Sequence, residues 1–313
     1  MTKKIATREA YGQELVRLGA DNKNVVVLDA DLSKSTKTHD FMKTYPDRFF
    51  NMGIAEGNLM STAAGLATVG KIPFASTFAM FATGRAFEQI RNSICYPKLN
   101  VKIAATHAGV TVGEDGGSHQ SIEDIAIMRA LPGMTVFVPA DAVETAACLR
   151  AAVEIQGPVY IRLGRSGVPT IHGEDFKFTP GEAVTLRQGS DVALVATGIM
   201  VSAALEAAEA LATVGIQAKV VDVHTIKPLD IFAIVEAARE CGAVVTAEEH
   251  SIIGGLGSAV AETLAEHHAV PLQRVGVRDT FGESGKPAEL LEHFGLTSAG
   301  IVEAAKKVIA KKK

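Results

Sequence analysis

The densest group of side chains capable of acid–base chemistry lies in one segment, THAGVTVGEDGGSHQSIED, at positions 106–124. It contains His107, Asp115 and His119 among several glycines. Any one of these polar residues could belong to an ordinary turn, since turns are rich in such residues. Three of them in one loop after an expected strand favour a binding or catalytic site, where a histidine exchanges protons near neutral pH. A metal site is the weaker interpretation, because the spacing matches no standard ligand pattern.

Other chemically capable side chains stand near the ends of expected strands. Glu56 lies in GIAEG, just before a stretch of small residues, where the dipole of a helix alone would favour a glutamate. Phe78 and Phe81, in STFAMF, are three residues apart, which is also the spacing of two core residues on one helix. Arg165 follows the run GPVYIRLG, and a single arginine is most often a surface charge. Taken singly, each of these residues has an ordinary structural explanation.

The elements that must position these residues follow a regular alternation of apolar, β-branched runs and helix-length segments. In the first half we predict strands at 24–30, 71–76, 100–106, 134–139 and 157–163, with helices at 58–69, 81–93 and 142–154. In the second half we predict strands at 190–198, 217–225, 242–249 and 272–279, with helices at 202–215, after Pro228, after Gly257 and at the C-terminus.

This alternation is typical of α/β proteins, in which helices cover both faces of a mainly parallel sheet. The pattern breaks over 164–190, where glycine and proline are frequent. We therefore predict two α/β domains, at 1–170 and 186–313, joined by a linker at 171–185. Open sheets of this kind bind ligands at the carboxyl ends of their strands, which is where the residues above lie.

Composition narrows the classes of function. The 313 residues are 47% hydrophobic and 21% charged, with a formal net charge of -4, which fits a globular protein and gives no reason to expect nucleic acid as a partner. We expect no signal peptide and no membrane span. The three cysteines are widely spaced, which favours reduced thiols in the cytoplasm over a disulfide framework or a zinc site.

Five segments, in order, resemble the transketolase family. They are ATR at 6–8, DADLSKS at 29–35, GIAEG at 53–57, STFAMF at 76–81 and the segment at 106–124 with its Thr-His pair, GEDG and His-Gln pair. The resemblance covers the first domain, and the second is similar to the family's C-terminal domain in length and layout. It implies a pyrimidine-binding domain, a transketolase C-terminal-type domain and thiamine diphosphate as the cofactor.

The resemblance also implies roles at the cofactor. Glu56 would bind a ring nitrogen of the cofactor's aminopyrimidine and so help the cofactor to lose a proton and become a nucleophile. Phe78 and Phe81 would pack on the pyrimidine, and the loop carrying Asp31 and Leu32 would complete the cofactor site. The family often has a further tyrosine where this chain has Gly84.

On the substrate side, the resemblance implies a sugar phosphate as ligand. The positions that match the family's phosphate-binding residues are Arg8, Ser35, His107 and Arg165. The planar guanidinium of arginine suits phosphate oxygens, which supports this assignment. Asp115 would bind a donor hydroxyl, and His107 and His119 would position substrate oxygens and take part in catalysis. No metal ligand is predicted within this chain.

A complete enzyme of this family also needs a domain that anchors the cofactor diphosphate through Mg²⁺ or another divalent cation. Its mark is GDG followed by an asparagine, and GDG occurs nowhere in this sequence. The resemblance is therefore to the C-terminal subunit of a split transketolase. We expect the GDG-bearing, N-terminal-type subunit as its partner, with two copies of each chain in a heterotetramer working in the pentose phosphate pathway or another sugar pathway.

Two other classes of function remain as alternatives. One is a related thiamine enzyme: the beta subunit of a 2-oxoacid dehydrogenase decarboxylating component, which needs no sugar-phosphate ligands, or a deoxyxylulose-phosphate synthase, which normally contains GDG in one long chain. The other is a nucleotide-binding or electron-transfer module. Neither half has a GxGxxG motif after its first strand, and the module leaves the segments around Glu56, Phe78 and His119 without a role.

Overall fold

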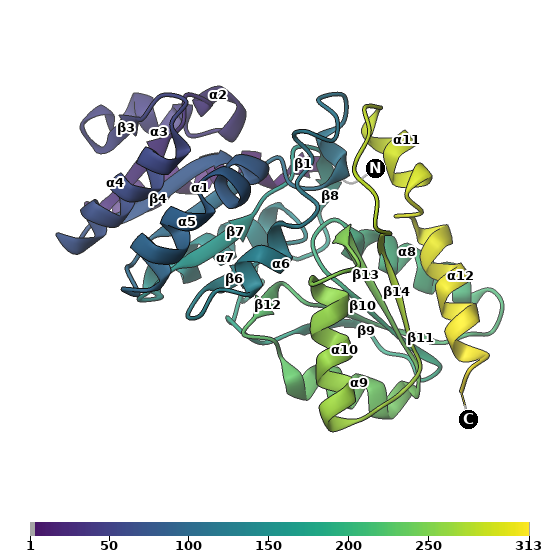
Figure 1. The fold of residues 1–313 in the computed structure, drawn as a ribbon. Helices are drawn as coiled ribbons and strands as arrows, with labels where there is room; N and C mark the ends of the chain where they lie inside the picture. The colour runs from purple at the N-terminus through teal and green to yellow at the C-terminus, as the bar shows by residue number, and fades with distance from the viewer. Residues whose placement is uncertain (1–3, 313) are drawn as a thin grey trace.

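The strands form two main sheets, one in each half of the chain, and helices cover both faces of each sheet (Figure 1). The computed structural model describes residues 4–312. A third, two-stranded sheet pairs β1 (Lys4–Ala6) with β8 (Gly167–Pro169) and thereby joins the two ends of the first domain. The α/β fold class predicted from the sequence, two mainly parallel sheets flanked by helices, is confirmed.

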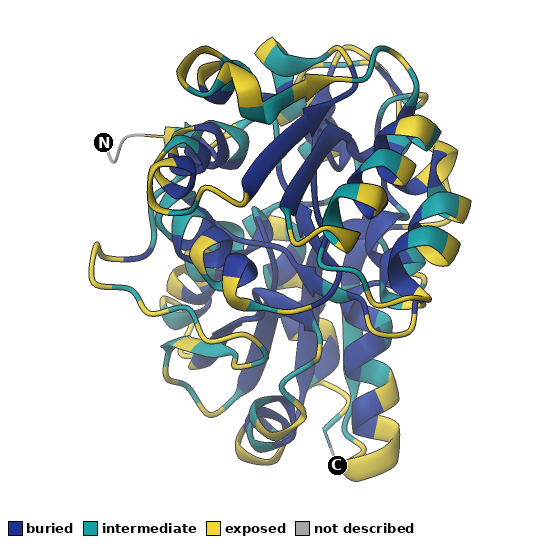
Figure 2. Ribbon diagram, turned by 90° about the vertical axis from the view of Figure 1, so that its left-hand side faces the viewer, coloured by how far each residue is buried: buried dark blue, intermediate teal, exposed yellow. Residues whose placement is uncertain are grey.

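The first sheet has seven strands. Its order is β12 (Thr225–Lys227), β6 (Thr135–Phe137), β7 (Val159–Arg162), β5 (Lys102–Thr106), β4 (Ile72–Phe78), β2 (Val25–Asp29) and β3 (Phe49–Asn51). Every neighbouring pair is parallel except β12 with β6. All residues of the central strands β4 and β5 are buried, as expected of parallel strands covered on both faces (Figure 2).

The second sheet has five strands. Its order is β14 (Leu272–Val277), β13 (Val244–Ser251), β10 (Val192–Ala196), β11 (Ala218–Asp222) and β9 (Val184–Arg187). Only β9, at one edge, runs antiparallel to its neighbour. β10 and β11 are buried along their whole lengths.

The helices bury apolar faces against these sheets. Those of the first half are α1 (Thr7–Asp21), α2 (Ser33–Thr36), α3 (His39–Thr44), α4 (Glu56–Thr68), α5 (Phe87–Gln89), α6 (Asp124–Arg129) and α7 (Ala142–Glu154). Those of the second half are α8 (Met200–Ala212), α9 (Ile231–Cys241), α10 (Leu256–His267), α11 (Pro287–His293) and α12 (Ser298–Ile309). One apolar cluster runs without interruption from the α4 side of the first sheet to the α9 and α10 side of the second, so the two domains share a core.

The structure departs from the sequence expectation at several places. The helix expected over 81–93 contains two π-helical turns, Phe81–Arg85 and Ile90–Cys95, on either side of α5. The strand expected over 217–225 stops at Asp222, and β12 then pairs with β6 of the first sheet, because the chain crosses between the domains there. α1 and the small strand β3 were not among the expected elements.

The carboxyl ends of β2, β4, β5 and β7 lie side by side at one edge of the first sheet. The segments DADLSKS, STFAMF and 106–124 lie at the ends of β2, β4 and β5, whereas ATR and GIAEG lie at the starts of α1 and α4. α11 and the loop before it reach from the second domain to the loops above this edge (Figure 1). Within residues 4–312, no helix combines the length and the apolar character that crossing a membrane demands.

Candidate active site

Glu56 is the first residue of α4, and its side chain is 2% exposed. Both of its carboxylate oxygens accept hydrogen bonds from Nη1 of Arg85, at 2.9 and 3.0 Å. Arg85 ends the first π-helical turn, and its side chain is 52% exposed. A π-helical turn holds one residue more than an α-helical turn and is often found at functional sites, and here it directs an arginine at a buried carboxylate.

An aromatic stack lies beside this ion pair. The guanidinium carbon of Arg85 is 4.4 Å from the centre of the Phe81 ring. Phe81 is stacked with Phe78, with 5.9 Å between ring centres. The His107 ring is stacked on Phe78, with 3.8 Å between ring centres. His119 approaches Phe81 with its edge, at 5.3 Å between ring centres. With the ion pair, the fold therefore brings together six side chains from three separate segments of the sequence.

His107 follows the last residue of β5 in a left-handed backbone conformation, with φ of 59°. Burial, with the nearby cations Arg8 and Arg165, lowers the pKa of His107 to about 3, so the ring is neutral near pH 7. Its Nε2 lies 3.3 Å from Nη1 of Arg8, which can only donate. Nε2 is therefore the acceptor, and Nδ1 carries the hydrogen that it donates to Thr106 Oγ1 at 2.8 Å.

Arg8, at the start of α1, joins His107 to the loop after β2. Its Nη1 also donates to the backbone carbonyl of Ser35 at 2.8 Å, while its buried Nε has no hydrogen-bond partner among the described residues. Burial and the nearby Arg165 lower the pKa of Arg8 from its usual value. A half-buried arginine with an unused donor beside a second cation is a suitable place for an anion.

Arg165 lies beyond β7, and its Nη1 donates to the carbonyl of Val112. The same atom is 3.7 Å from a carboxylate oxygen of Glu114 and 3.6 Å from one of Asp115. Both carboxylates are exposed, so these ion pairs are in contact with water and weak. The guanidinium can therefore exchange them for another anion at small cost.

The loop after β2 is organised by a carboxylate that the sequence analysis did not single out. Asp29 accepts hydrogen bonds from the Leu32 amide at 2.6 Å and from the hydroxyls of Thr36 and Thr38 at 2.6 and 2.9 Å. Burial raises the pKa of this carboxyl, while these hydrogen bonds lower it. Asp31 is exposed in a left-handed conformation, with φ of 63°, and accepts a hydrogen bond from Asn51 at 2.9 Å.

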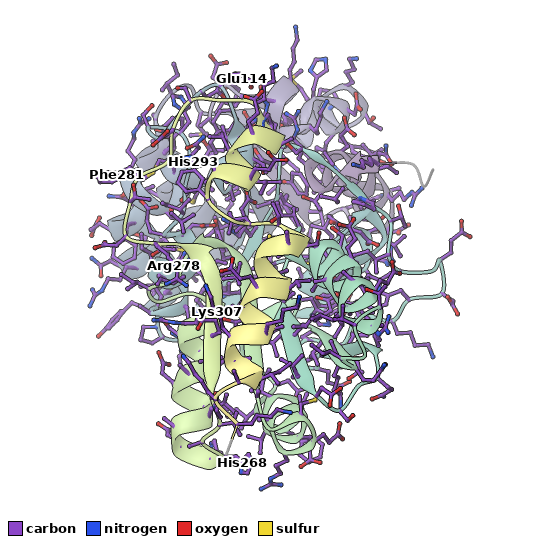
Figure 3. The ribbon with its side chains drawn as sticks, turned by 90° about the vertical axis from the view of Figure 1, so that its right-hand side faces the viewer. Glu114, His268, Arg278, Phe281, His293 and Lys307 are labelled. Atoms are coloured by element: carbon purple, nitrogen blue, oxygen red, sulfur yellow. The ribbon has the colours of Figure 1, made fainter. Side chains whose placement is uncertain are left out.

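A cavity of about 320 Å³ opens beside Phe81 and Arg85. Its lining comes from the π-helical turn, the loop before α6 and the second domain: Met80, Phe81, Arg85, Gly117, Ser118, Gln120, Ile122, Glu123 and Phe281. A Cβ on Gly84 would lie 2.5 Å from the terminal methyl of Met80, so methionine occupies space next to the position where a tyrosine is common in the family. Phe281, on the loop after β14, is 84% exposed at the edge of the molecule (Figure 3).

The second domain supports the active loop. Glu249, on β13, accepts a hydrogen bond from the Thr111 amide at 2.7 Å, and its carboxylate occupies the space that a Cβ on Gly109 would need. The side-chain amide of Gln120 donates to Val110, Gly113 and Glu283 carbonyls at 3.2, 3.1 and 2.8 Å. The loop therefore takes its shape from both domains.

The structure thus brings Glu56, Phe78, Phe81, His107 and His119 into one set of contacts, with Arg8, Ser35, Arg165 and Asp115 joined to it by hydrogen bonds, ion pairs or their electrostatic influence on His107. Asp31 and Leu32 lie on the adjoining loop, and no hydrogen bond or ion pair links their side chains to that set within residues 4–312. Sequence reasoning missed Arg85, although an arginine a few residues after the aromatic pair was visible.

The chain is similar to known proteins in both sequence and fold. The model of the transketolase pyrimidine-binding domain matches residues 3–170, and that of the transketolase C-terminal domain matches residues 181–301. A solved structure described as a split gene transketolase, an inactive beta4 tetramer, is 64% identical, with a TM-score of 0.93, and covers 99% of this chain and 100% of that chain.

Two curated proteins are similar over nearly their whole lengths. A Methanocaldococcus jannaschii protein provisionally named as a transketolase C-terminal section is 52% identical, over 95% of this chain and 94% of its own. The 6-deoxy-6-sulfo-D-fructose transketolase subunit of Clostridium sp. (strain MSTE9) is 47% identical, over 97% of this chain and 95% of its own.

Proposed function

Because the chain belongs to the transketolase family, we propose that it is the pyrimidine-side subunit of a thiamine-diphosphate-dependent transketolase, working with a diphosphate-binding partner chain. The observation that carries this proposal is the position of Glu56. A buried carboxylate stands at the strand-end edge, linked through Arg85 to an aromatic pair that also contacts His107 and His119.

These residues suit one end of the cofactor. Phe78 and Phe81 offer stacked aromatic faces to a flat heteroaromatic ring, and the 320 Å³ cavity beside Phe81 provides access. Glu56 and this pair would hold the pyrimidine, with the loop of Asp31 and Leu32 beside them. Thiamine diphosphate, when bound, supplies the nucleophilic carbon that no side chain in this site offers.

Glu56 would have two states, one paired with Arg85 and one hydrogen-bonded to the cofactor's ring nitrogen. An ionised carboxylate can only accept hydrogen bonds, and an unprotonated ring nitrogen can also only accept. Glu56 must therefore leave Arg85 and gain a proton before it can donate to that nitrogen. The exposed position of Arg85 allows this exchange, because its guanidinium can turn into solvent. We propose that the ion pair holds the site inactive until the cofactor and the partner are in place.

The cations of the edge fit the anionic end of a sugar substrate. The Nε of Arg8 has no hydrogen-bond partner among the described residues, and Nη1 of the same arginine donates to the Ser35 carbonyl. The ion pairs of Arg165 are with exposed carboxylates. His107 stays neutral, so its Nε2 can accept a hydrogen bond from a sugar hydroxyl in place of the one from Arg8. His119 and Asp115 would bind further hydroxyls, and His119 would also move a proton.

We propose that the substrates are sugar phosphates, from which a two-carbon ketol unit is transferred to an aldose phosphate. The similar Clostridium subunit is named for a sulfonated sugar, and arginine binds a sulfonate through the same hydrogen bonds that bind a phosphate. If the assembled enzyme prefers sulfonated ketoses to phosphorylated ones, the substrates are sulfonated sugars and not sugar phosphates.

The partner is proposed from the chemistry that this chain does not offer. The sequence has no GDG motif, and the similar proteins of the same length are described as a section or a subunit of a transketolase. The divalent cation and its ligands would belong to the partner, in an assembly of two copies of each chain. The three buried, unpaired cysteines are in keeping with a cytoplasmic location.

The test combines the purified chain with an N-terminal-type transketolase subunit that contains GDG, together with thiamine diphosphate and Mg²⁺. We expect ketol transfer between a ketose phosphate and an aldose phosphate from the mixture and none from either chain alone. Glu56→Gln in the same mixture is the matched inactive control. Turnover by this chain alone would contradict the proposal that a partner chain is needed. Decarboxylation of a 2-oxoacid without ketol transfer would favour the dehydrogenase alternative.

A further inference from the structure

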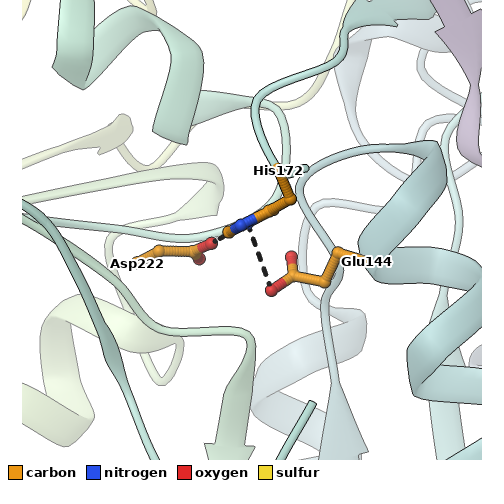
Figure 4. Close-up of side chains that lie close together, drawn as sticks. All are labelled: Glu144, His172 and Asp222. Carbon is orange, nitrogen blue, oxygen red and sulfur yellow. Dashed lines mark hydrogen bonds and ion pairs between the residues drawn. The ribbon is translucent and has the colours of Figure 1, made fainter. Parts of the chain in front are cut away.

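Three acid–base side chains meet where the two domains and the linker join (Figure 4). Glu144 is in the first turn of α7, His172 lies in the segment after β8, and Asp222 is the last residue of β11. All three are buried, and they are outside the set of residues assigned to the active site. One ligand atom from each lies within 4.8 Å of the others.

The geometry of this junction cluster matches the coordination sphere of a small dication. His172 Nε2 is 3.0 Å from Asp222 Oδ2 and 3.6 Å from Glu144 Oε1. Ligands about 2.0–2.1 Å from a tetrahedral zinc ion are separated from one another by roughly 3.3 Å. The two observed separations fall on either side of that value.

Two oxygens of the cluster have no hydrogen-bond partner among the described residues: Glu144 Oε1 and Asp222 Oδ1. Both belong to fully buried side chains, where an unsatisfied carboxylate oxygen is costly. The second oxygen of Glu144 is used, because it accepts a hydrogen bond from the Ala140 amide at 2.6 Å. That bond fixes the carboxyl group with its free oxygen toward the histidine.

A second layer of contacts fixes His172. Asp141, the N-cap of α7, accepts hydrogen bonds from the amides of Ile171 and His172 at 2.6 and 2.8 Å. The Phe176 ring packs on the imidazole, with 4.0 Å between ring centres. Outer contacts of this kind orient the ligands of metal sites.

Charge supports the same conclusion. Two ionised carboxylates with one neutral imidazole would carry two negative charges in a dry junction, which one divalent cation cancels. The other way to relieve the repulsion is a single proton shared between the carboxyl groups.

We propose that Glu144, His172 and Asp222 bind one divalent transition-metal ion of the zinc class, with a water molecule as fourth ligand. The ion ties α7, the linker and β11 together and has no part in ketol transfer. Because the three ligands are separated by 28 and 50 positions in the sequence, no motif could reveal them.

The experiment uses the full chain alone, after treatment with a chelator. The divalent cation assigned to the partner chain is therefore absent from the sample. Zn²⁺ is titrated calorimetrically, and Co²⁺ is followed by its visible absorption, which is strong for tetrahedral sites. We expect one saturable ion per chain and a higher unfolding temperature with metal. His172→Gln and Glu144→Gln should weaken binding by more than the roughly 10–100-fold loss that outer-shell changes produce.

Surface histidines provide the matched control. His267 and His268 lie near the end of α10, and the variant His267→Gln/His268→Gln should bind Zn²⁺ as the wild type does. Loss of binding in this variant with retention in His172→Gln would identify adventitious surface binding and overturn the proposal. Absence of saturable binding to the folded wild type would also overturn it and leave the shared proton as the explanation. The wild-type titration decides between these outcomes even where a variant fails to fold.

Discussion

Buried carboxylates have a basic partner at two places in this molecule, and the two places differ in how far that partner is exposed to solvent. At the active edge, the strand-end edge of the first sheet that carries the candidate active site, Glu56 is buried, but its partner Arg85 is half exposed and can leave. At the domain junction, Glu144, His172 and Asp222 are all buried, and none can move without opening the junction. Similar ionic chemistry thus yields an exchangeable contact in one place and a fixed one in the other.

The difference follows from solvent. An ion pair with one exposed member contributes little to stability, because water replaces the lost partner. A buried group that loses its partner has no water to replace it, so the loss is severe. Substitutions at the two places should therefore differ in their effects on activity and on stability.

The first prediction concerns the active edge alone. Glu56→Gln should lower turnover of the assembled enzyme by roughly 100- to 10,000-fold, since it removes the acid–base group proposed to act on the cofactor. Steady-state ketol transfer at saturating thiamine diphosphate is the measurement, with assembly checked by gel filtration. A near-normal rate would remove Glu56 from the mechanism.

The second prediction compares the two basic partners directly. Under chelating conditions, His172→Ala should lower the free energy of unfolding by roughly 3–5 kcal/mol, because it leaves buried carboxyls uncompensated. Arg85→Ala should lower it by less than about 1 kcal/mol, because the space that the half-exposed arginine leaves lets water reach the Glu56 carboxylate. Denaturant unfolding of both variants and the wild type gives the two values, and similar losses would abolish the contrast.

A third prediction concerns Arg165. Hydrogen bonds to charged groups are worth about 1.5–3 kcal/mol each, so Arg165→Ala should lower kcat/KM for phosphorylated sugars roughly 10- to 150-fold. Much of the loss should appear in KM, because the phosphate is held in the ground state as well. Hydroxypyruvate with an unphosphorylated acceptor should react almost normally.

The control for that measurement is Arg278→Ala, which truncates an exposed arginine of the second domain (Figure 3). It should leave both classes of substrate unaffected. Equal losses in Arg165→Ala for phosphorylated and unphosphorylated substrates would make Arg165 a structural residue.

The fourth prediction concerns how the free energy of unfolding changes with pH. The pKa of His107 is about 3 in the folded chain and 6.5 in its reference state, so the unfolded chain binds the extra proton as pH falls below 6.5. Stability should therefore be lost on acidification, by at most about 1.4 kcal/mol per pH unit. Between pH 7 and 5, His107→Asn should lose roughly 1–2 kcal/mol less than the wild type, and His268→Asn should match the wild type. Equal losses in His107→Asn and the wild type would mean that His107 is not held neutral.

The smallest effect is expected from releasing Glu56. Arg85→Gln removes a competitor for that carboxylate, so the assembled enzyme should bind thiamine diphosphate up to roughly fivefold more tightly, the equivalent of about 1 kcal/mol. Arg91→Gln, a neighbouring exposed arginine bonded only to Asn92 among the described residues, is the matched control. Weaker binding in Arg85→Gln would mean that the arginine holds Glu56 in a useful position.

Much of the active edge could be predicted before the structure was known. The alternation of apolar runs fixes the α/β class, and segments such as GIAEG and GEDG mark the edge because each follows a strand or begins a helix there. What periodicity could not supply is the π-helical turn that aims Arg85 at Glu56, since an extra residue in one turn leaves the apolar pattern almost unchanged.

The fold class, the family and the residue types of the active edge can be read from the amino-acid sequence, because they depend on local pattern and short motifs. Which charges face one another depends on how distant segments pack in the folded chain. The support of Thr111 by Glu249, the crossing of β12 into the first sheet and the meeting of Glu144, His172 and Asp222 all join residues far apart in the chain. Such contacts arise from how two domains pack, and packing is a property of the whole folded surface that no local pattern encodes.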